Sequence, residues 1–230
     1  GRRPLTRRLP RGDAALAHSG FITVPTPDIG GEIDISARTV TLTGGSVLLA
    51  GIIEGQGSPE SRAGNLTLNA SEQVLLQEGS IVGNIVFADS TGTAGNVEIR
   101  TAILEVRDGA QLSAITIGEG NAGSVLIWAG DRVSFSGTSE DGQFRSVAGS
   151  AVNSGGIGDG GNVEIRTATL EVRDGASLSA STFGAGNAGS VLIRASDRVS
   201  FSGTSEDGRF NSGAFSQVEP GSIGDSGNVE

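Results

Sequence analysis

Residues 95–114 read GNVEIRTAILEVRDGAQLSA and residues 161–180 read GNVEIRTATLEVRDGASLSA, so the unit that starts at Gly95 starts again at Gly161. Over the 48 positions from 95 to 142, only seven differ from their counterparts in 161–208. The unit starts a third time at Gly227. Long tandem repeats of this kind build stacked structures in which each unit contacts its neighbours. The repeat therefore predicts a solenoid, and it argues against a fold organised around one unique site.

Apolar and polar residues alternate within each unit. The alternation is clear in residues 97–100, 104–107 and 111–114, and a turn signal, Asp-Gly, stands at 108–109. A period of two places the apolar residues on one face of a strand, and no stretch of similar length keeps the helical period of 3.6. Each unit is therefore predicted to supply short strands, about three per coil, with essentially no helix after residue 28.

A landmark of glycine, one polar residue and alternating apolar residues marks the start of each coil. The landmarks divide the first repeat into a short coil over 95–122 and a long coil over 123–160. Equivalent strands of successive coils would pair in parallel at a spacing of about 4.8 Å. The landmarks begin at Gly31, Gly64, Gly95, Gly123, Gly161, Gly189 and Gly227.

These observations predict an all-β fold, a parallel β-helix of about six to seven coils over residues 28–230. Double-coil repeats occupy 95–160 and 161–226. Like residues would stack on like, with Val97 and Ile99 opening one column and Leu104 and Val106 another. A β-sandwich or barrel is the competing fold, but it does not require a nearly identical sequence to return at a fixed long interval.

The extra residues of the long coils are assigned to external loops. They are placed after Gly142 and Gly208, where QFRSVAGSAVNSGG and RFNSGAFSQVEPGS differ strongly between the two copies. Divergence between otherwise matching copies is typical of an exposed loop.

Residues 1–27 differ from the rest of the chain. Five arginines lie in the first eleven residues, and prolines interrupt a segment without clear alternation. Such a composition disfavours a packed core, so a poorly ordered lead-in is predicted. It contains the tripeptide Arg11-Gly12-Asp13, a sequence that occurs often by chance, and His18, the only histidine, which is expected to be solvated.

Composition excludes several classes of function. The chain has no Cys, Met or Tyr, and all 16 of its basic residues are Arg. From Asp13 onward 11 arginines face 26 acidic residues, and a body this acidic repels nucleic-acid phosphates. No apolar run approaches the roughly 20 residues that span a bilayer. We therefore expect neither a nucleic-acid partner nor a membrane span.

Acidic residues recur in matched sets. Glu98, Glu105 and Asp108 return at the equivalent positions of the second repeat, and the pair Glu140–Asp141 returns as Glu206–Asp207. Paired carboxylates perform acid–base chemistry on polysaccharides in some enzymes. Here they occupy outward positions or turns and several are followed by Arg, a pattern typical of a solvated, charge-balanced surface. We predict no catalytic residues and no enzymatic activity.

Two glycine-rich patterns resemble ligand-binding motifs. Residues 155–159 (GGIGD) are similar to the start of a calcium-binding nonapeptide, but Asp159 stands one place early. Residues 118–123 and 184–189 match GxGxxG, but both lead into a strand, whereas a dinucleotide site requires a helix there. Both patterns are interpreted as turn chemistry, and neither a metal site nor a cofactor is predicted.

Trp128 is the only tryptophan, and its counterpart one repeat later is Arg194. An inward position would not exchange Trp for Arg, so both side chains are predicted to point outward. An exposed aromatic ring can stack on a sugar. Trp128 is therefore the one candidate for a surface ligand contact.

The phrases LEVRDGASLSASTFGAG and GNAGSVLIRASDRVSFSG, which together cover 170–203, resemble a known family. They are similar to the repeat region of large bacterial exoproteins of the filamentous haemagglutinin type, including cyanobacterial versions labelled S-layer-family or haemagglutination-activity proteins. The resemblance extends over residues 28–230. It implies right-handed β-helical coils, export through an outer-membrane two-partner transporter, and a secreted or cell-surface location on a Gram-negative-type bacterium. It supplies no catalytic residues.

The functional hypothesis is a repetitive shaft segment of an adhesin-like exoprotein, which displays and attaches to host-cell or extracellular carbohydrate or protein surfaces. Two alternatives stay open. A carbohydrate-active β-helix, either a lyase or a hydrolase, would require a non-repeated cluster of acids and bases along one groove. A self-associating surface-layer protein is compatible with the Arg- and Glu-rich faces.

Overall fold

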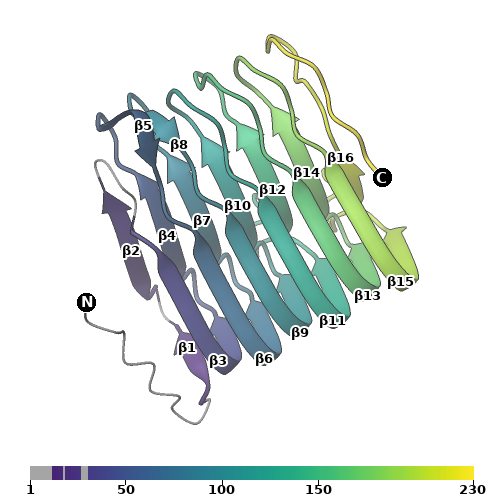
Figure 1. Ribbon diagram of the computed structural model, residues 1–230. Coiled ribbons are helices and arrows are strands. Elements are labelled where there is room, and N and C mark those ends of the chain that lie inside the picture. Colours follow the sequence, from purple (N-terminus) through teal and green to yellow (C-terminus); the bar gives the residue numbers. More distant parts are fainter. Residues whose placement is uncertain (1–11, 18, 27–30) are drawn as a thin grey trace.

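The computed structural model describes residues 12–17, 19–26 and 31–230 (Figure 1). The strands form two seven-stranded sheets and one two-stranded ladder, and the described residues contain no helix. Every strand pair within these sheets is parallel. The chain thus winds as a parallel β-solenoid of about six turns, which confirms the predicted fold over the sandwich or barrel.

The sheets are named A, B and C. Sheet A holds β1 (Ala14–Leu16), β3 (Ile33–Leu42), β6 (Leu66–Leu76), β9 (Val97–Arg107), β11 (Val125–Ser136), β13 (Val163–Arg173) and β15 (Val191–Ser202). Sheet B holds β2 (Phe21–Thr26), β4 (Val47–Ile52), β7 (Ile81–Val86), β10 (Gln111–Thr116), β12 (Val147–Val152), β14 (Ser177–Thr182) and β16 (Gly213–Phe215). Sheet C holds β5 (Gly57–Arg62) and β8 (Thr91–Thr93).

Equivalent residues of successive coils lie side by side. Val125 pairs with Val97 on one side and with Val163 on the other, and Val163 pairs in turn with Val191. All four side chains are fully buried between sheets A and B. Burying a side chain of this size contributes about 1.5–3 kcal/mol, so each coil adds a similar increment to the stack. The second predicted column is confirmed in the same way, with Leu104 beside Val133 and Val106 beside Phe135.

The strands are fewer and longer than predicted. Residues 97–100 and 104–107 belong to one continuous strand, β9. Between these two segments the register of β9 against β11 shifts, and the two strands remain paired on both sides of the shift. At the shift, Ala102 of β9 stands opposite both Gly130 and Asp131 of β11, so the extra residue forms a bulge in β11 and neither strand is broken.

Two columns of glycine allow the coils to approach closely. Gly120 has a φ of 132°, and a Cβ at this position would lie 1.9 Å from the carbonyl oxygen of Gly92. The landmark glycines form the second column, in which each one from Gly95 onward lies against the landmark of the preceding coil. The GxGxxG pattern at 118–123 combines one member of each column, so its role as turn chemistry is confirmed.

The polar residue after each landmark glycine links neighbouring coils. The side-chain oxygen of Asn96 accepts the backbone N–H of Ser124 at 2.9 Å. The Ser124 hydroxyl oxygen accepts the N–H of Asn162 at 3.0 Å, and Asn162 accepts that of Ser190 at 2.9 Å. Side chains therefore satisfy backbone donors where the chain enters each new strand, which explains the Asn or Ser of the landmark.

Buried polar side chains of sheet B form hydrogen bonds to the column of landmark glycines. Asn84 is fully buried, donates to the carbonyl oxygen of Gly64 at 2.8 Å and accepts the N–H of Gly95 at 3.0 Å. Ser150 makes the equivalent two bonds, both of 2.8 Å, to the next pair of landmark glycines. These inward polar residues satisfy backbone groups that face the core.

The prediction of external loops after Gly142 and Gly208 is wrong. The middle of the first segment is strand β12, whose inward side chains are buried, and the second contains β16. The main insertion lies earlier, at 138–145, where the chain forms a small antiparallel hairpin. The copies diverge here because outward positions of a strand change without disturbing the core, as positions in a loop do.

The solenoid begins before residue 28. Strands β1 and β2 lie within the segment assigned to the lead-in, and they pair with β3 and β4. Their alternation is short and ends at Pro25, so the composition of residues 1–27 concealed it. The prediction for residues 1–11, including Arg11, and that for His18 lie outside the described residues.

Asp13, the acid of the Arg-Gly-Asp tripeptide, is engaged within the solenoid. Its carboxylate accepts the Thr39 hydroxyl at 2.7 Å and pairs with Arg38 at 2.7 Å. The hydroxyl of Thr39 and the charge of Arg38 hold the pKa of Asp13 below its ordinary value, although partial burial opposes them. Arg38 also pairs with Glu72 at 2.8 Å, so the acid belongs to a three-residue ion-pair network.

Candidate functional site

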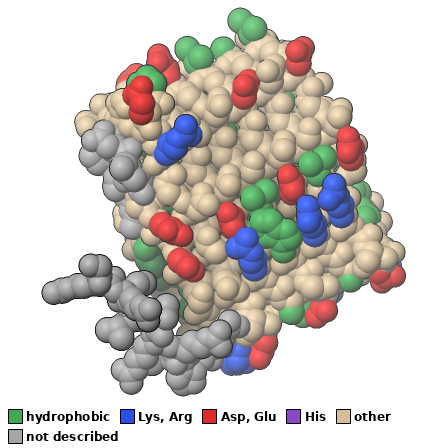
Figure 2. All heavy atoms as spheres, in the orientation of Figure 1, with side chains coloured by type: hydrophobic (Ala, Val, Ile, Leu, Met, Phe, Trp, Pro, Cys, Tyr) green, Lys and Arg blue, Asp and Glu red, His purple; other side chains and the backbone are tan. Residues whose placement is uncertain are grey.

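The outer face of sheet A carries Trp128 in a row of arginines. Trp128 pairs in register with Arg100 on one side and Arg166 on the other, and Arg194 follows beside Arg166. The predicted outward direction is thus confirmed. The Arg100 guanidinium lies 4.5 Å from the centroid of the indole, within the range of a cation–π contact. Figure 2 shows basic and acidic side chains around hydrophobic ones on this face.

The environment of Trp128 limits it as a ligand platform. Its side chain is half-buried, and Arg100, which also pairs with Glu98 at 2.9 Å, covers the ring. A sugar that stacks on the same ring face would have to displace this guanidinium. The indole therefore acts first as a packing partner of the arginine row.

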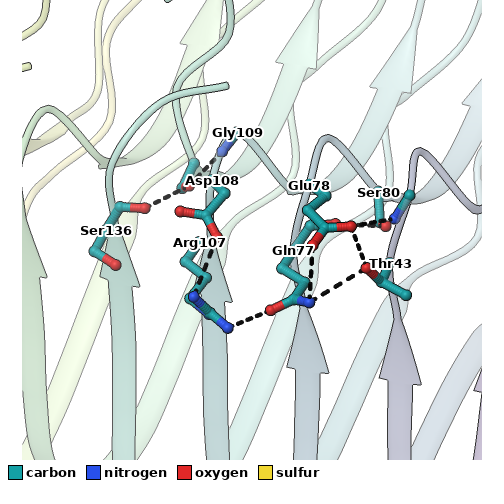
Figure 3. Close-up of polar contacts among 10 residues, drawn as sticks. Thr43, Gln77, Glu78, Ser80, Arg107, Asp108, Gly109 and Ser136 are labelled. Atoms are coloured by element: carbon teal, nitrogen blue, oxygen red, sulfur yellow. Dashed lines mark hydrogen bonds and ion pairs between the residues drawn. The ribbon is translucent and has the colours of Figure 1, made fainter. Parts of the chain in front are cut away.

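The turns from sheet A to sheet B form a second row of polar contacts (Figure 3). Glu78 and Asp108 occupy equivalent positions, with φ values of 55° and 56° in the left-handed region. Arg107 pairs with Asp108 at 3.3 Å and donates to the side chain of Gln77, which in turn donates to Thr43 at 3.2 Å. The turns of these three successive coils are thus linked by side chains, and Asp108 takes part through its pair with Arg107.

A cavity of about 670 Å³ opens beside these turns. Its lining includes the carboxylates of Glu78, Asp108, Glu140 and Asp141. A neighbouring cavity of about 520 Å³ adds Glu206 and Asp207. Within the part of the chain that the structure describes, no three acidic or histidine side chains converge as metal ligands.

Two of these acids stabilise the hairpins that they belong to. Asp141 accepts the Ser139 hydroxyl at 2.6 Å and the backbone N–H of Gln143 at 3.1 Å. These bonds lower the pKa of Asp141, and the copies of the same groups, led by the Ser205 hydroxyl, lower that of Asp207. A carboxylate with a lowered pKa is a weaker base and a poor proton donor near neutral pH, so this arrangement caps turns and is unsuited to general acid–base chemistry.

The remaining recurrent acids are paired on the surface. Glu98 pairs with Arg100, and Glu105 pairs with Arg132 of the next coil at 2.9 Å. The arginine side chains of these pairs are about half exposed, whereas those of Glu98 and Glu105 are only 15% and 27% exposed. Surface ion pairs that solvent screens contribute about 0–1 kcal/mol each. The interpretation of these two acids as part of a charge-balanced surface is confirmed.

The calcium-like segment has a structural role in the stack. The Asp159 carboxylate accepts the backbone N–H of Asn187 at 2.9 Å, while its own N–H donates to Asn121 at 2.8 Å. Asn187 continues the ladder by accepting the N–H of Asp225 at 2.9 Å. Asp159 therefore occupies a position that asparagine fills equally well in the neighbouring coils.

A third cavity, which sequence reasoning missed, lies on the outer face of sheet B and measures about 270 Å³. Phe144, Arg145, Phe183 and Phe210 contribute to its walls. Arg145, Phe183 and the nearby Phe215 are residues at which the two repeats differ. These differences were the available signal, but those at Arg145 and Phe215 were interpreted as loop variation and the one at Phe183 was not used.

Neither family models, curated proteins nor solved structures give a significant match to this chain. Across the described ranges, no helix is long and apolar enough to cross a membrane.

Proposed function

We propose that this chain is a shaft segment of a secreted or cell-surface adhesin-like exoprotein, which projects and displays binding surfaces. The single observation that carries the proposal is the continuous parallel pairing of equivalent strands through sheets A and B, each of seven strands. Each coil advances the stack by about 4.8 Å, so each double-coil repeat extends it by roughly 10 Å with the same cross-section. A uniform, laterally bonded rod is suited to holding a surface away from a cell.

The acidic groups favour this role over a carbohydrate-active enzyme. An enzyme needs one set of groups with tuned pKa values in a cleft. In this chain, Asp141 and its copy Asp207 have lowered pKa values and cap turns, while Glu98 and Glu105 are paired with arginines. Export by a two-partner transporter and a location at the outer surface of a Gram-negative-type bacterium belong to the same proposal, and they rest on the family resemblance.

Retention on surfaces tests the attachment function. Beads coated with this chain would be passed over immobilised glycans and extracellular-matrix proteins, with beads carrying an unrelated protein of similar net charge as the control. We expect selective retention of the coated beads on at least one surface. Equal retention of both bead types on every surface would contradict attachment.

A separate assay distinguishes the enzyme. Pectate, alginate, xylan and glucan would be incubated with the chain, with and without calcium, and read by reducing ends and by the absorbance of unsaturated products. We expect no turnover. Reproducible turnover that one Asp or Glu substitution abolishes would replace the shaft proposal with a polysaccharide lyase or hydrolase.

A further inference from the structure

Sheet B presents an outer face without charge. The outward residues of β4, β7, β10, β12 and β14 are aliphatic, small, hydroxyl or amide side chains. The outer face of sheet A, by contrast, carries arginines and glutamates in most rows. Since charged residues are normally interspersed over solvent-exposed surfaces, an uncharged face on a chain of net charge −10 is suited to contact with another molecule.

The cavity of about 270 Å³ lies on this face, beside the hairpin at 138–145. Aromatic rings form its walls, and two of them, Phe144 and Phe183, are 55% and 45% exposed. Small outward residues form its floor, so the rings stand above a shallow base. The floor residues are Ser113, Gly149 and Ser179, and the amides of Gln111 and Gln143 lie at its edge.

Arg145 brings a cation into this uncharged setting. Its guanidinium lies 5.4 Å from the ring of Phe210 and 5.9 Å from that of Phe215. Burial lowers the pKa of Arg145, and the Glu219 carboxylate opposes that effect from a distance. In the described part of the chain, the guanidinium makes no ion pair within 4.0 Å and no side-chain hydrogen bond. Its five N–H donors are therefore available to an acceptor.

Several of the differences between the two repeats lie around the same cavity. Arg145 is replaced by Asn211 in the second copy, and Phe183 stands where the first copy has Ile117. Gln111 and Ile115, which also line the cavity, are two of the seven differences in the closely matched 48 positions. A scaffold that repeats almost unchanged while one face varies is typical of repeat proteins that bind ligands on that face.

We propose that this cavity binds a sugar that bears a carboxylate. A guanidinium pairs with a carboxylate through two parallel hydrogen bonds, and aromatic rings such as Phe144 and Phe183 stack on the C–H face of a pyranose. The hydroxyl and amide groups of Ser113, Ser179 and Gln111 recognise sugar hydroxyls. At about 270 Å³ the cavity is smaller than most drug-sized sites of about 300–1,000 Å³, so it takes one sugar residue while the rest of the glycan lies outside.

The charge of the whole chain restricts the ligand further. The hairpin acids Glu140 and Asp141 and the net charge of −10 repel a dense polyanion. Screening over about 8 Å at physiological salt leaves a single carboxylate at Arg145 little affected. A glycan that ends in one acidic sugar is therefore favoured over a uniformly charged polymer. The inference rests on the proposed display function, to which it adds a ligand.

A matched pair of sugars tests the proposal. Methyl β-D-glucuronide and methyl β-D-glucoside differ only in the carboxylate, and methyl α-N-acetylneuraminide offers a carboxylate on a different ring. Each would be titrated to high millimolar concentration against the isotope-labelled chain by NMR. We expect at least one acidic sugar to bind with millimolar Kd and to shift the backbone amides of Ser113, Gly149 and Ser179. The glucoside should bind at least about tenfold more weakly.

Three variants make the test specific. Arg145→Gln should weaken binding of the acidic sugar by about tenfold or more, and Phe183→Ile, which installs the residue of the other repeat, should weaken it with an unchanged Tm. Arg166→Gln, on the far face, should leave Kd unchanged.

The proposal fails if neither acidic sugar binds, if the glucoside binds equally well, or if Arg145→Gln has no effect. Tighter binding of N-acetylphenylalanine than of either acidic sugar would overturn it in favour of a peptide carboxylate. Because the beads measure attachment anywhere on the surface, retained beads with an empty cavity would contradict this inference alone.

Discussion

Gly123 lies so close to Gly95 of the preceding coil that a Cβ added at Gly123 would come within 2.0 Å of the Gly95 carbonyl oxygen. Both sides of this contact are backbone, so no change of rotamer can relieve it. The same relationship recurs between Gly161 and Gly123, at 2.2 Å, and between Gly189 and Gly161, at 1.9 Å. The column of landmark glycines therefore sets how closely the coils stack at this corner.

Gly123→Ala should destabilise the chain by about 3 kcal/mol or more, because the coils must separate to admit the methyl group. Gly130→Ala is the matched control: Gly130 lies in β11, the strand that begins two residues after Gly123, and its added Cβ would meet nothing nearer than 4.0 Å. We expect about 0.5 kcal/mol or less for the control. Urea denaturation measures both, and equal midpoints would contradict the role of the glycine column.

Asn84→Ala should cost about 2–3 kcal/mol, since it leaves the N–H of Gly95 and the carbonyl oxygen of Gly64 without their partner in the core. Asn84→Ser should cost clearly less, because Ser150 makes the same two bonds in its own coil. Thermal unfolding compares the three proteins. A serine variant as unstable as the alanine variant would show that the hydrogen bonds are not the reason for the polar residue.

Ile165→Asp should destabilise by several kcal/mol, because its charge would enter the apolar column of fully buried residues without a partner. Glu164 is the adjacent outward residue, and Glu164→Gln should change stability by about 0.5 kcal/mol or less. Similar shifts in Tm for the two variants would mean that the faces of β13 are reversed.

The Asp141 carboxyl should titrate below 3.8, its unperturbed pKa, because the Ser139 hydroxyl and the Gln143 N–H both stabilise the charged form. A group with a depressed folded-state pKa stabilises the fold above its unfolded pKa, and that contribution is lost as pH falls through the folded pKa. The hairpin should therefore loosen only below about pH 3.8. NMR titration of the side chain gives the midpoint, and Ser139→Ala should raise it. A wild-type midpoint at or above 3.8 would contradict the capping role.

The apolar columns followed directly from the sequence. Val97 and Val125 stand two residues after landmark glycines, so aligning the landmarks aligns the residues that pair. The outward direction of Trp128 followed from its exchange with Arg194, and its contact with Arg100 follows from the same alignment. These features depend only on the position of a residue within its coil, and aligning the repeats gives that position directly.

Other features depend on how the coils fit together, which periodicity does not reveal. Asn84 and Ser150 are polar residues at inward positions, and their partners are backbone groups of other coils. Variation at 147–152 resembled a loop because the outward positions of a strand and the residues of a loop tolerate change alike. The cavity at Arg145 was missed for that reason, since its walls come from residues of both repeats.

The stacking of like on like has a consequence for the history of such a chain. Residues 161–208 meet the coil before them with nearly the same side chains that residues 95–142 present, so the joint between one repeat and the next is interchangeable. Unequal crossing-over between copies would insert or delete whole double-coil units without creating a junction that the fold does not already contain. Rod length can thus drift in steps of about 10 Å while the cross-section stays fixed. Sequence change is then confined to the outward positions, where one repeat can acquire an arginine or a phenylalanine that the equivalent position of the other repeat lacks.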